Sequence, residues 1–170
     1  MTKNSNQKIL LDADIIIHFI KGEKILLLPK IFQQKKVILD IVCQELVKNP
    51  NMKVFYENLI RFGLIEEISF TNDFAVIKEY ARLKMMFGNG ESACMAYCKF
   101  HKDILASSNL SDIKKYCDNN NIQYLTTMDF LCEAFRKNKM SEAECDEFIY
   151  NVLSKGSILP CKTIKEFLSK

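Results

Sequence analysis

The sequence predicts an α/β fold, with a mainly parallel sheet of about five short strands between two layers of helices. Two observations lead to this prediction. Short apolar runs of a few residues alternate along the chain with longer segments of helical spacing, which is the pattern of βα units. The first run is continuously apolar, as is typical of strands that are buried on both faces. The expected strands are residues 8–11, 37–39, 64–70, 103–107 and 122–125.

The segments between these strands are expected to be helical, and several begin with a capping signal. Asp14 is the expected N-cap of the first helix, Asp40 that of the helix after the second strand, and Asn109 that of the helix after the fourth. Ser141 and Glu144 have the spacing of a capping box that opens a last long helix. The expected helices are residues 15–20, 26–34, 41–46, 54–62, 71–86, 91–100, 110–119, 127–135 and 142–153, with a short turn from residue 163.

Length and composition favour a single domain. The chain has 170 residues, of which 48% are hydrophobic and 26% are charged, which is ordinary for a globular protein. The net charge of +3 permits a nucleic-acid partner without requiring one. We expect one domain over residues 1–170, with a core at about 8–138 and a C-terminal helical extension at 141–170.

The cysteines and the N-terminus indicate a cytoplasmic protein. Seven cysteines are scattered along the chain, and an odd, scattered set favours reduced thiols over a disulfide framework. Residues 1–8 are polar and lack the apolar core of a signal peptide. Since no apolar run approaches the roughly 18 residues of a membrane span, no membrane partner is expected.

Four acids are expected at one edge of the predicted sheet. Ligands of open α/β sheets bind outside the carboxyl ends of the strands. Asp12 follows the first strand, Glu45 lies in the helix after the second, Glu91 opens a helix behind residues 88–90 (Gly-Asn-Gly), and Asp112 begins the helix after the fourth strand. Clustered carboxylates are costly without a cation, and oxygen ligands suit Mg²⁺ or Mn²⁺. Such metals activate water and stabilise phosphate charge, so we predict a metal-dependent nuclease site.

Three segments carry a family resemblance, namely residues 10–17 (LLDADIII), 41–46 (IVCQEL) and 88–94 (GNGESAC). In order and spacing they resemble the motifs of PIN-domain proteins, of the kind found as VapC-type toxins of bacterial toxin–antitoxin pairs. The resemblance covers about residues 8–138. It implies a PIN-like three-layer α/β/α sandwich and an endoribonuclease in which Asp12, Glu45 and Glu91 bind Mg²⁺ or Mn²⁺. It also implies an RNA substrate, a possible antitoxin protein as partner, and a homodimer.

The fourth motif of the family is atypical in this chain. PIN domains commonly end the fourth strand in a Thr/Ser-Asn-Asp-like stretch, whereas this chain has residues 107–112 (SSNLSD). Leu110 stands where many members carry an aspartate, and Asp112 follows two residues later. Either Asp112 takes over, or the site holds one metal less firmly, or activity is lost. The alternative function is therefore a catalytically impaired PIN-fold protein that binds RNA or another protein.

Five further residues are candidates for contacts with substrate or with the metal ligands. Asp14 is explained by helix capping but could also belong to the metal site. Ser108 and Asn109 could hydrogen-bond a phosphate or cap the following helix. Arg82 and Lys84 lie on the helix that leads into the Gly-Asn-Gly turn, where they could contact RNA phosphates.

Overall fold

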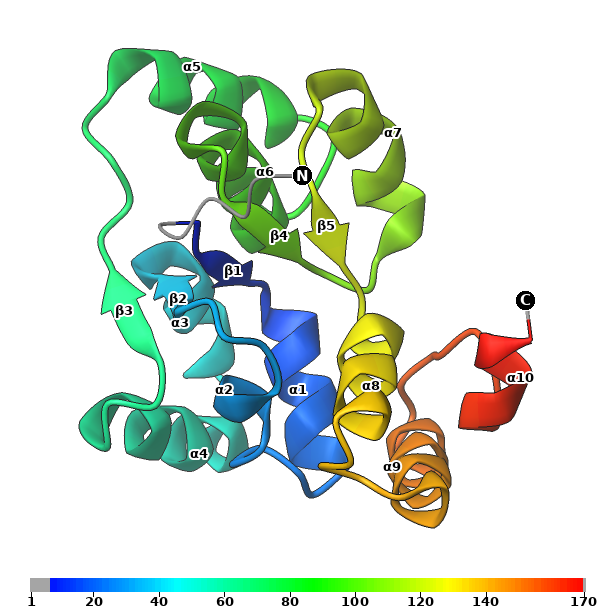
Figure 1. Ribbon diagram of the computed structural model, residues 1–170. Coiled ribbons are helices and arrows are strands. Elements are labelled where there is room, and N and C mark those ends of the chain that lie inside the picture. The colour runs from blue at the N-terminus through cyan, green and yellow to red at the C-terminus, as the bar shows by residue number, and fades with distance from the viewer. Residues whose placement is uncertain (1–6, 170) are drawn as a thin grey trace.

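Five short strands form one parallel sheet. The computed structural model describes residues 7–169, and its sheet has the strand order β3-β2-β1-β4-β5 (Figure 1). Every pair of neighbouring strands is parallel, for example β1 with β4, where Leu11 pairs with Ala106. This confirms the predicted fold class. The strands are β1 (Ile9–Leu11), β2 (Lys36–Leu39), β3 (Glu66–Ile68), β4 (Ile104–Ala106) and β5 (Tyr124–Leu125).

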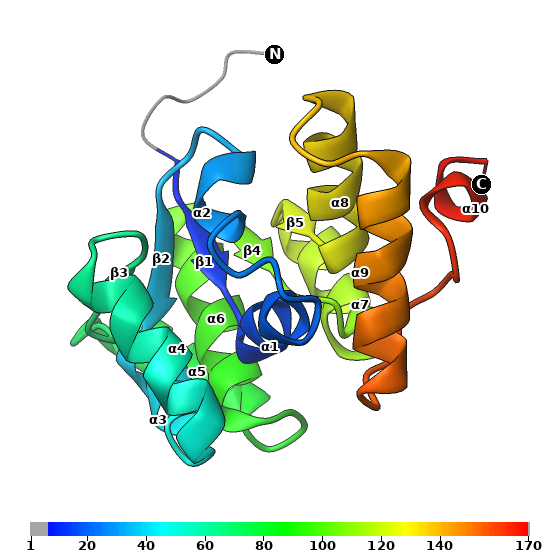
Figure 2. The same cartoon turned by 90° about the horizontal axis from the view of Figure 1, so that it is seen from below.

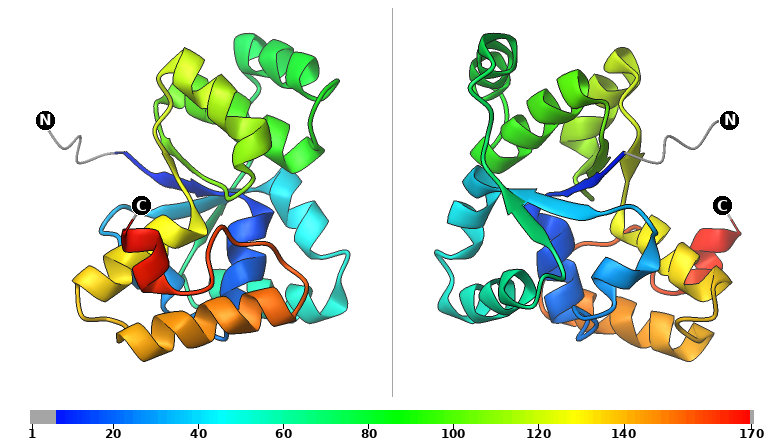
Figure 3. Two further views of the ribbon diagram at one scale, coloured as in Figure 1. Left: turned by 90° about the vertical axis from the view of Figure 1, so that its right-hand side faces the viewer. Right: turned by 60° about the vertical axis from the view of Figure 1, so that its left-hand side comes forward.

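Helices cover both faces of the sheet, which makes a three-layer sandwich. Figure 3 shows α5, α6 and α7 on one side, and α1, α4, α8 and α9 on the other. The first half of the chain contributes α1 (Ala13–Lys21), α2 (Leu28–Ile31), α3 (Asp40–Leu46), α4 (Pro50–Arg61) and α5 (Phe74–Leu83). The second half contributes α6 (Asn89–His101), α7 (Leu110–Asn120), α8 (Thr127–Arg136), α9 (Glu142–Ser154) and α10 (Ile164–Leu168).

β1 and α6 form the centre of the core. All three residues of β1 are fully buried, and α6 is buried along the whole stretch from Ala93 to Cys98. Small side chains at positions 93, 94, 96 and 98 allow α6 to lie close to β1, β2 and β4. The seven cysteines, all within the described residues, are buried.

Several helix starts differ from the predictions, and those of α3 and α4 show why. Leu39, not Asp40, is the N-cap of α3, and the Asp40 carboxylate accepts the backbone N–H groups of Ile41 and Phe70. α4 begins at Pro50, four residues before the predicted start, because the Asn49 side chain caps it and proline suits a first helical position. The predicted capping box at residues 141 and 144 is confirmed.

The C-terminal helices pack against α1 and α8 (Figure 2). The Phe148 ring of α9 is fully buried, with its centroid 5.0 Å from that of Phe19 in α1. Gly22, at the end of α1, leaves room for this ring, since a Cβ there would overlap it. Asp146 of α9 accepts the backbone N–H of Ile164 at 2.8 Å, which fixes the start of α10. Among residues 7–169, no helix combines the length and apolar character of a membrane span.

Candidate functional site

The order of the strands places a ligand site between β1 and β4. From β1 the chain proceeds outward to β2 and β3 on one side, and then returns to add β4 and β5 on the other. The connections therefore diverge at the carboxyl ends of β1 and β4, where open α/β sheets bind ligands. Asp12 directly follows β1, and Ser107 directly follows β4. The two loops are joined there, since the Asp12 N–H donates to the carbonyl of Ala106 at 2.9 Å.

Asp12 is the N-cap of α1, a role that the sequence analysis assigned wrongly to Asp14. Its extended backbone (φ −83°, ψ 161°) makes the junction between β1 and α1, and its Oδ1 accepts the Ala13 N–H at 2.8 Å. The side chain is buried. Burial, followed by the nearby charges of Asp14 and Glu45, raises the pKa of Asp12 to about 7.

Asp14 lies in the first turn of α1 and reaches across to the loop after β4. Its Oδ2 accepts the Ser108 N–H at 2.7 Å and the Ser107 hydroxyl at 3.4 Å. Its Oδ1 is buried and has no hydrogen-bond partner among residues 7–169. Burial raises the pKa of Asp14. A buried carboxylate oxygen without a partner is costly, so this atom is a candidate for contact with a ligand.

Glu45 is held at the start of α6 by Gly90. The carboxylate comes from the end of α3, and its Oε1 accepts the Gly90 N–H at 2.9 Å. The partial positive charge of a helix N-terminus favours a carboxylate at this point. A Cβ on residue 90 would lie 2.8 Å from Glu45 Oε2, so glycine is needed for this approach. The Gly-Asn-Gly motif thus orients one of the predicted acids.

Glu91 follows Gly90 in α6 and lies close to Asp12 and Asp14 on one side and to Asp112 on the other. Burial raises the pKa of Glu91 to about 8, and the charges of Asp12, Asp112 and Asp14 add to the effect. Asp112, in the first turn of α7, accepts a hydrogen bond from Asn109 Nδ2 at 2.9 Å and another from the Ser111 hydroxyl at 3.0 Å. The structure thus brings together all four predicted acids and Asp14.

The chemistry of this cluster fits a hydrated divalent cation. Asp12, Asp14, Glu45, Glu91 and Asp112 offer carboxylate oxygens only, which suits a hard cation. Asp14 Oδ1 is buried and has no hydrogen-bond partner among the described residues, and neighbouring carboxylates contribute to the raised pKa values of Asp12 and Glu91. Within the described part of the chain, no three acidic, thiol or imidazole side chains are placed to hold an ion by themselves. Mg²⁺ keeps several waters and takes one or two carboxylates directly, so the cluster suits an ion held partly through water.

The other candidate residues lie around the acids in different roles. Ser108 and Asn109 bind Asp14 and Asp112, respectively, and so position acids. Arg82 forms a salt bridge with Glu79 at 2.8 Å. Lys84 lies over the ring of Tyr80, 5.8 Å from its centroid, so contacts of either cation with RNA remain predictions.

The sequence analysis missed a buried polar chain behind Asp14. His18 Nδ1 lies 2.8 Å from the Thr127 hydroxyl, and that hydroxyl lies 2.8 Å from the Ser108 hydroxyl. The Thr127 N–H also donates to Ser108 Oγ at 2.9 Å. Burial lowers the pKa of His18 to about 4, so its imidazole is neutral at neutral pH. His18 and Thr127 are 109 positions apart, and the only sequence signal was a histidine in an otherwise apolar helix.

The parallel sheet of this order, with helices on both faces, is a PIN-like α/β fold, which the comparisons with solved structures support. No family model and no curated protein matches the sequence. Among solved structures, the chain is similar to VapBC2 from Rickettsia felis bound to a DNA fragment of its promoter, with a TM-score of 0.52 and 18% identity. It is also similar to VapBC-1 from nontypeable Haemophilus influenzae, with a TM-score of 0.53 and 15% identity. Each match covers 71% of this chain and 98% of the other. The fold predicted from the three motifs is therefore confirmed.

Proposed function

We propose that the protein is a Mg²⁺- or Mn²⁺-dependent endoribonuclease and acts as the toxin of a toxin–antitoxin pair. The observation that carries this proposal is the convergence of Asp12, Glu45, Glu91 and Asp112 at the carboxyl ends of β1 and β4. Burial and neighbouring carboxylates raise the pKa values of Asp12 and Glu91, so these two acids are poorly stabilised by the protein alone. Acids perturbed in this way support a functional site at this edge of the sheet.

The residues of the chain have distinct tasks in this proposal. Asp12, Glu45, Glu91 and Asp112 would hold the cation, with Asp14 beside them. A bound Mg²⁺ or Mn²⁺ would supply Lewis-acid stabilisation of phosphate charge and a lower pKa for attacking water. The Gly90 N–H and the loop after β4 hold Glu45 and Asp14 in place, so these carboxylates need little rearrangement when the ion binds.

Hydrolysis in this site would leave 5′-phosphate and 3′-hydroxyl ends. Water is the nucleophile, and no histidine or serine nucleophile is required. His18 is unsuited to act as a base, because it is buried and its Nδ1 is engaged by Thr127.

The proposed partner is an antitoxin protein encoded with this chain. The similar solved structures are of VapBC proteins, and one of them is bound to promoter DNA. We propose that such a partner blocks the acidic site, that the toxin forms a homodimer, and that it acts in the cytoplasm on RNA.

Cleavage of structured RNA in the presence of Mn²⁺ tests the proposed activity. Asp12→Asn and Glu91→Gln should each lower the cleavage rate by on the order of a hundredfold or more, since each removes a charged ligand. Glu57→Gln, an acid-to-amide change at an exposed position of α4, is the matched control and should cleave normally. Cleavage that persists in EDTA, or full activity in both site variants, would contradict the proposal.

A second candidate function is a PIN-fold binding protein without turnover. Leu110 stands at the start of α7 with 39% of its surface exposed, in place of an acid, and Asp112 is engaged by Asn109 and Ser111. Calorimetric titration with Mn²⁺ separates the two candidates. A ribonuclease should bind Mn²⁺ at millimolar concentration or below, and no binding in that range would favour the binding protein.

A further inference from the structure

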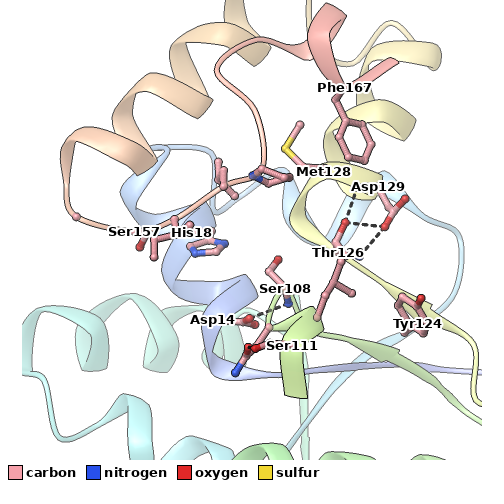
Figure 4. A pocket seen from close by; sticks show the side chains of 16 residues that line it. Asp14, His18, Ser108, Ser111, Tyr124, Thr126, Met128, Asp129, Ser157 and Phe167 are labelled. Atoms are coloured by element: carbon pink, nitrogen blue, oxygen red, sulfur yellow. Dashed lines mark hydrogen bonds between the residues drawn. The ribbon is translucent and has the colours of Figure 1, made fainter. Parts of the chain in front are cut away.

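A large pocket adjoins the acidic site. It has a volume of about 800 Å³ and lies between the loop after β4 and the loop that joins α9 to α10. Asp14 and Ser111 lie at one end of it and Phe167 at the other (Figure 4). The far wall comes from residues 156–160, in the C-terminal part of the chain.

Among residues 7–169, those that line this pocket present mostly apolar surface and include no lysine or arginine. The apolar surface comes from Leu110, Met128, Ile158 and Phe167. The ionisable groups at its wall include the carboxyls of Asp14 and Asp129. Such a pocket disfavours a phosphate. It favours an uncharged group with apolar faces and a few hydrogen-bond donors.

Asp14 connects the pocket to the acidic site. Its carboxylate lines the pocket, and its Oδ1 is buried without a hydrogen-bond partner in the described chain. Its Oδ2 is held by the backbone of Ser108, which also lines the pocket. A ligand in the pocket and a phosphodiester at the acids would therefore be neighbours.

Leu110 contributes directly to this arrangement. It is the residue that departs from the family pattern of acids, and it is half-exposed at the start of α7. In the structure its side chain forms part of the pocket lining. Leu110, which stands where many PIN domains carry an aspartate, thus extends the apolar lining of the pocket to the edge of the acidic cluster.

We propose that this pocket binds the base of a nucleotide next to the cleaved phosphodiester, an inference that rests on the proposed ribonuclease function. A base is flat, has apolar faces and carries donors at its edge. Tyr124 and Phe167 offer aromatic surface for stacking. The Asp129 carboxylate, whose Oδ2 accepts from Thr126, offers an acceptor for the N–H groups of a base. The phosphate stays outside, at the acids.

Binding of single nucleosides to the full-length protein tests the pocket independently of catalysis. Adenosine, guanosine, cytidine and uridine are titrated in EDTA and followed by NMR. At least one should bind, and Tyr124→Ala should weaken it about tenfold, which corresponds to the loss of one stacking contact. Ile158→Ser, at a position that is 89% exposed, should weaken it several-fold without affecting folding. Leu26→Ser, at a residue that is 61% exposed and outside the pocket, is the matched control and should bind as the wild type does.

The outcomes separate the pocket from the proposed function. Absence of nucleoside binding, or unchanged affinity in both pocket variants, would overturn the nucleobase pocket even if RNA is cleaved. Binding of the blocked tripeptide acetyl-Leu-Val-Phe-amide, lost in Ile158→Ser while no nucleoside binds, would assign the pocket to a peptide and also overturn it. Nucleoside binding without any Mn²⁺-dependent cleavage would support the pocket and contradict the ribonuclease.

Discussion

At the scale of single residues, the acids of the site make the metal-free protein sensitive to pH. Folding raises the pKa of Asp12 from 3.8 to about 7 and that of Glu91 from 4.5 to about 8. The folded state therefore binds these protons more tightly than the unfolded state. Their contribution to stability is fully present below about pH 4 and is lost as the pH rises through about 7 to 8.

Asp12→Asn should remove part of this pH dependence. In EDTA at about pH 9, the variant should be more stable than the wild type by on the order of 2 kcal/mol, which raises the melting temperature by about 4–8 °C. Near pH 4 the difference should vanish, because the wild-type carboxyl is then protonated when folded. Thermal unfolding across this range measures the effect, and equal melting temperatures at about pH 9 would contradict it.

Metal binding should compete with these protons. Carboxylates must be deprotonated to bind a cation, so Mn²⁺ should stabilise the wild type more at about pH 9 than at about pH 5. The measurement is the rise in melting temperature when millimolar Mn²⁺ is added to protein from which metal ions have first been removed with EDTA. Asp12→Asn should show a much smaller rise. A rise that is independent of pH, or equal in the variant, would count against the acids as ligands.

The positions of the acids could be predicted from the sequence, but not their individual roles. Asp12 follows β1, Glu91 and Asp112 lie in the first turns of α6 and α7, and Glu45 lies in the helix after β2. Parallel topology brings such positions to one edge of the sheet. The exchange of roles between Asp12 and Asp14 could not be predicted. The strand runs into the helix without a linker, so the first aspartate becomes the cap. The second is then turned toward a loop almost a hundred residues away in sequence.

At the scale of secondary-structure elements, Gly90→Ala tests how α6 holds Glu45. The added Cβ would lie 2.8 Å from Glu45 Oε2 and would displace the carboxylate. Stability should change by less than about 1 kcal/mol, because alanine is a better helix former than glycine. Cleavage should fall at least tenfold. Gly88→Ala is the matched control, since nothing lies within 4 Å of a Cβ there, and it should retain activity. Equal activity of both variants would show that Glu45 is dispensable.

Thr127→Val tests the link between α8 and the loop after β4. The change leaves His18 and Ser108 without their shared partner in the protein interior. The free energy of unfolding should fall by about 1–3 kcal/mol, the cost of buried polar groups that lose a hydrogen bond. Thr127→Ser keeps the hydroxyl and should lose less. Urea unfolding of the two variants gives the comparison, and a loss in Thr127→Ser as large as that in Thr127→Val would show that the hydroxyl contributes no more than the methyl group.

The existence of most elements could be predicted because each carries a local signal. All five predicted strands are present, although β3 begins with two exposed glutamates, and the capping box at residues 141 and 144 gave the start of α9. Boundaries were less predictable where local signals compete. Pro50 was expected to lie in a break between helices, but it is the first residue of α4. The helix predicted over residues 26–34 is shorter in the structure, where α2 has four residues.

At the scale of the whole molecule, the parallel sheet followed from the alternation of strands and helices, whereas the place of the C-terminal helices did not. The apolar face of α9 indicates that it is buried but does not specify against what. In the structure α9 packs on α1 and α8, and its loop to α10 closes the pocket beside the acids.

Phe148→Ala tests whether α9 belongs to the same cooperative unit as the sheet. The ring is fully buried and makes edge-on contact with Phe19, which in turn contacts Phe130 of α8. Loss of the ring should destabilise the protein by about 3–5 kcal/mol, as expected for a large-to-small change in a packed core. Phe148→Leu should lose less than half of that, because it leaves a smaller cavity.

The shape of the unfolding transition then shows how the C-terminal helices are coupled to the rest. If the contact of Phe148 with Phe19 joins α9 to α1, Phe148→Ala should lower the midpoint of a single urea transition seen alike by circular dichroism and by tyrosine fluorescence. An early transition confined to part of the signal would instead show that α9 and α10 unfold separately. Since the loop after α9 forms the far wall of the pocket, such separate unfolding would also weaken nucleoside binding before the acidic site is lost.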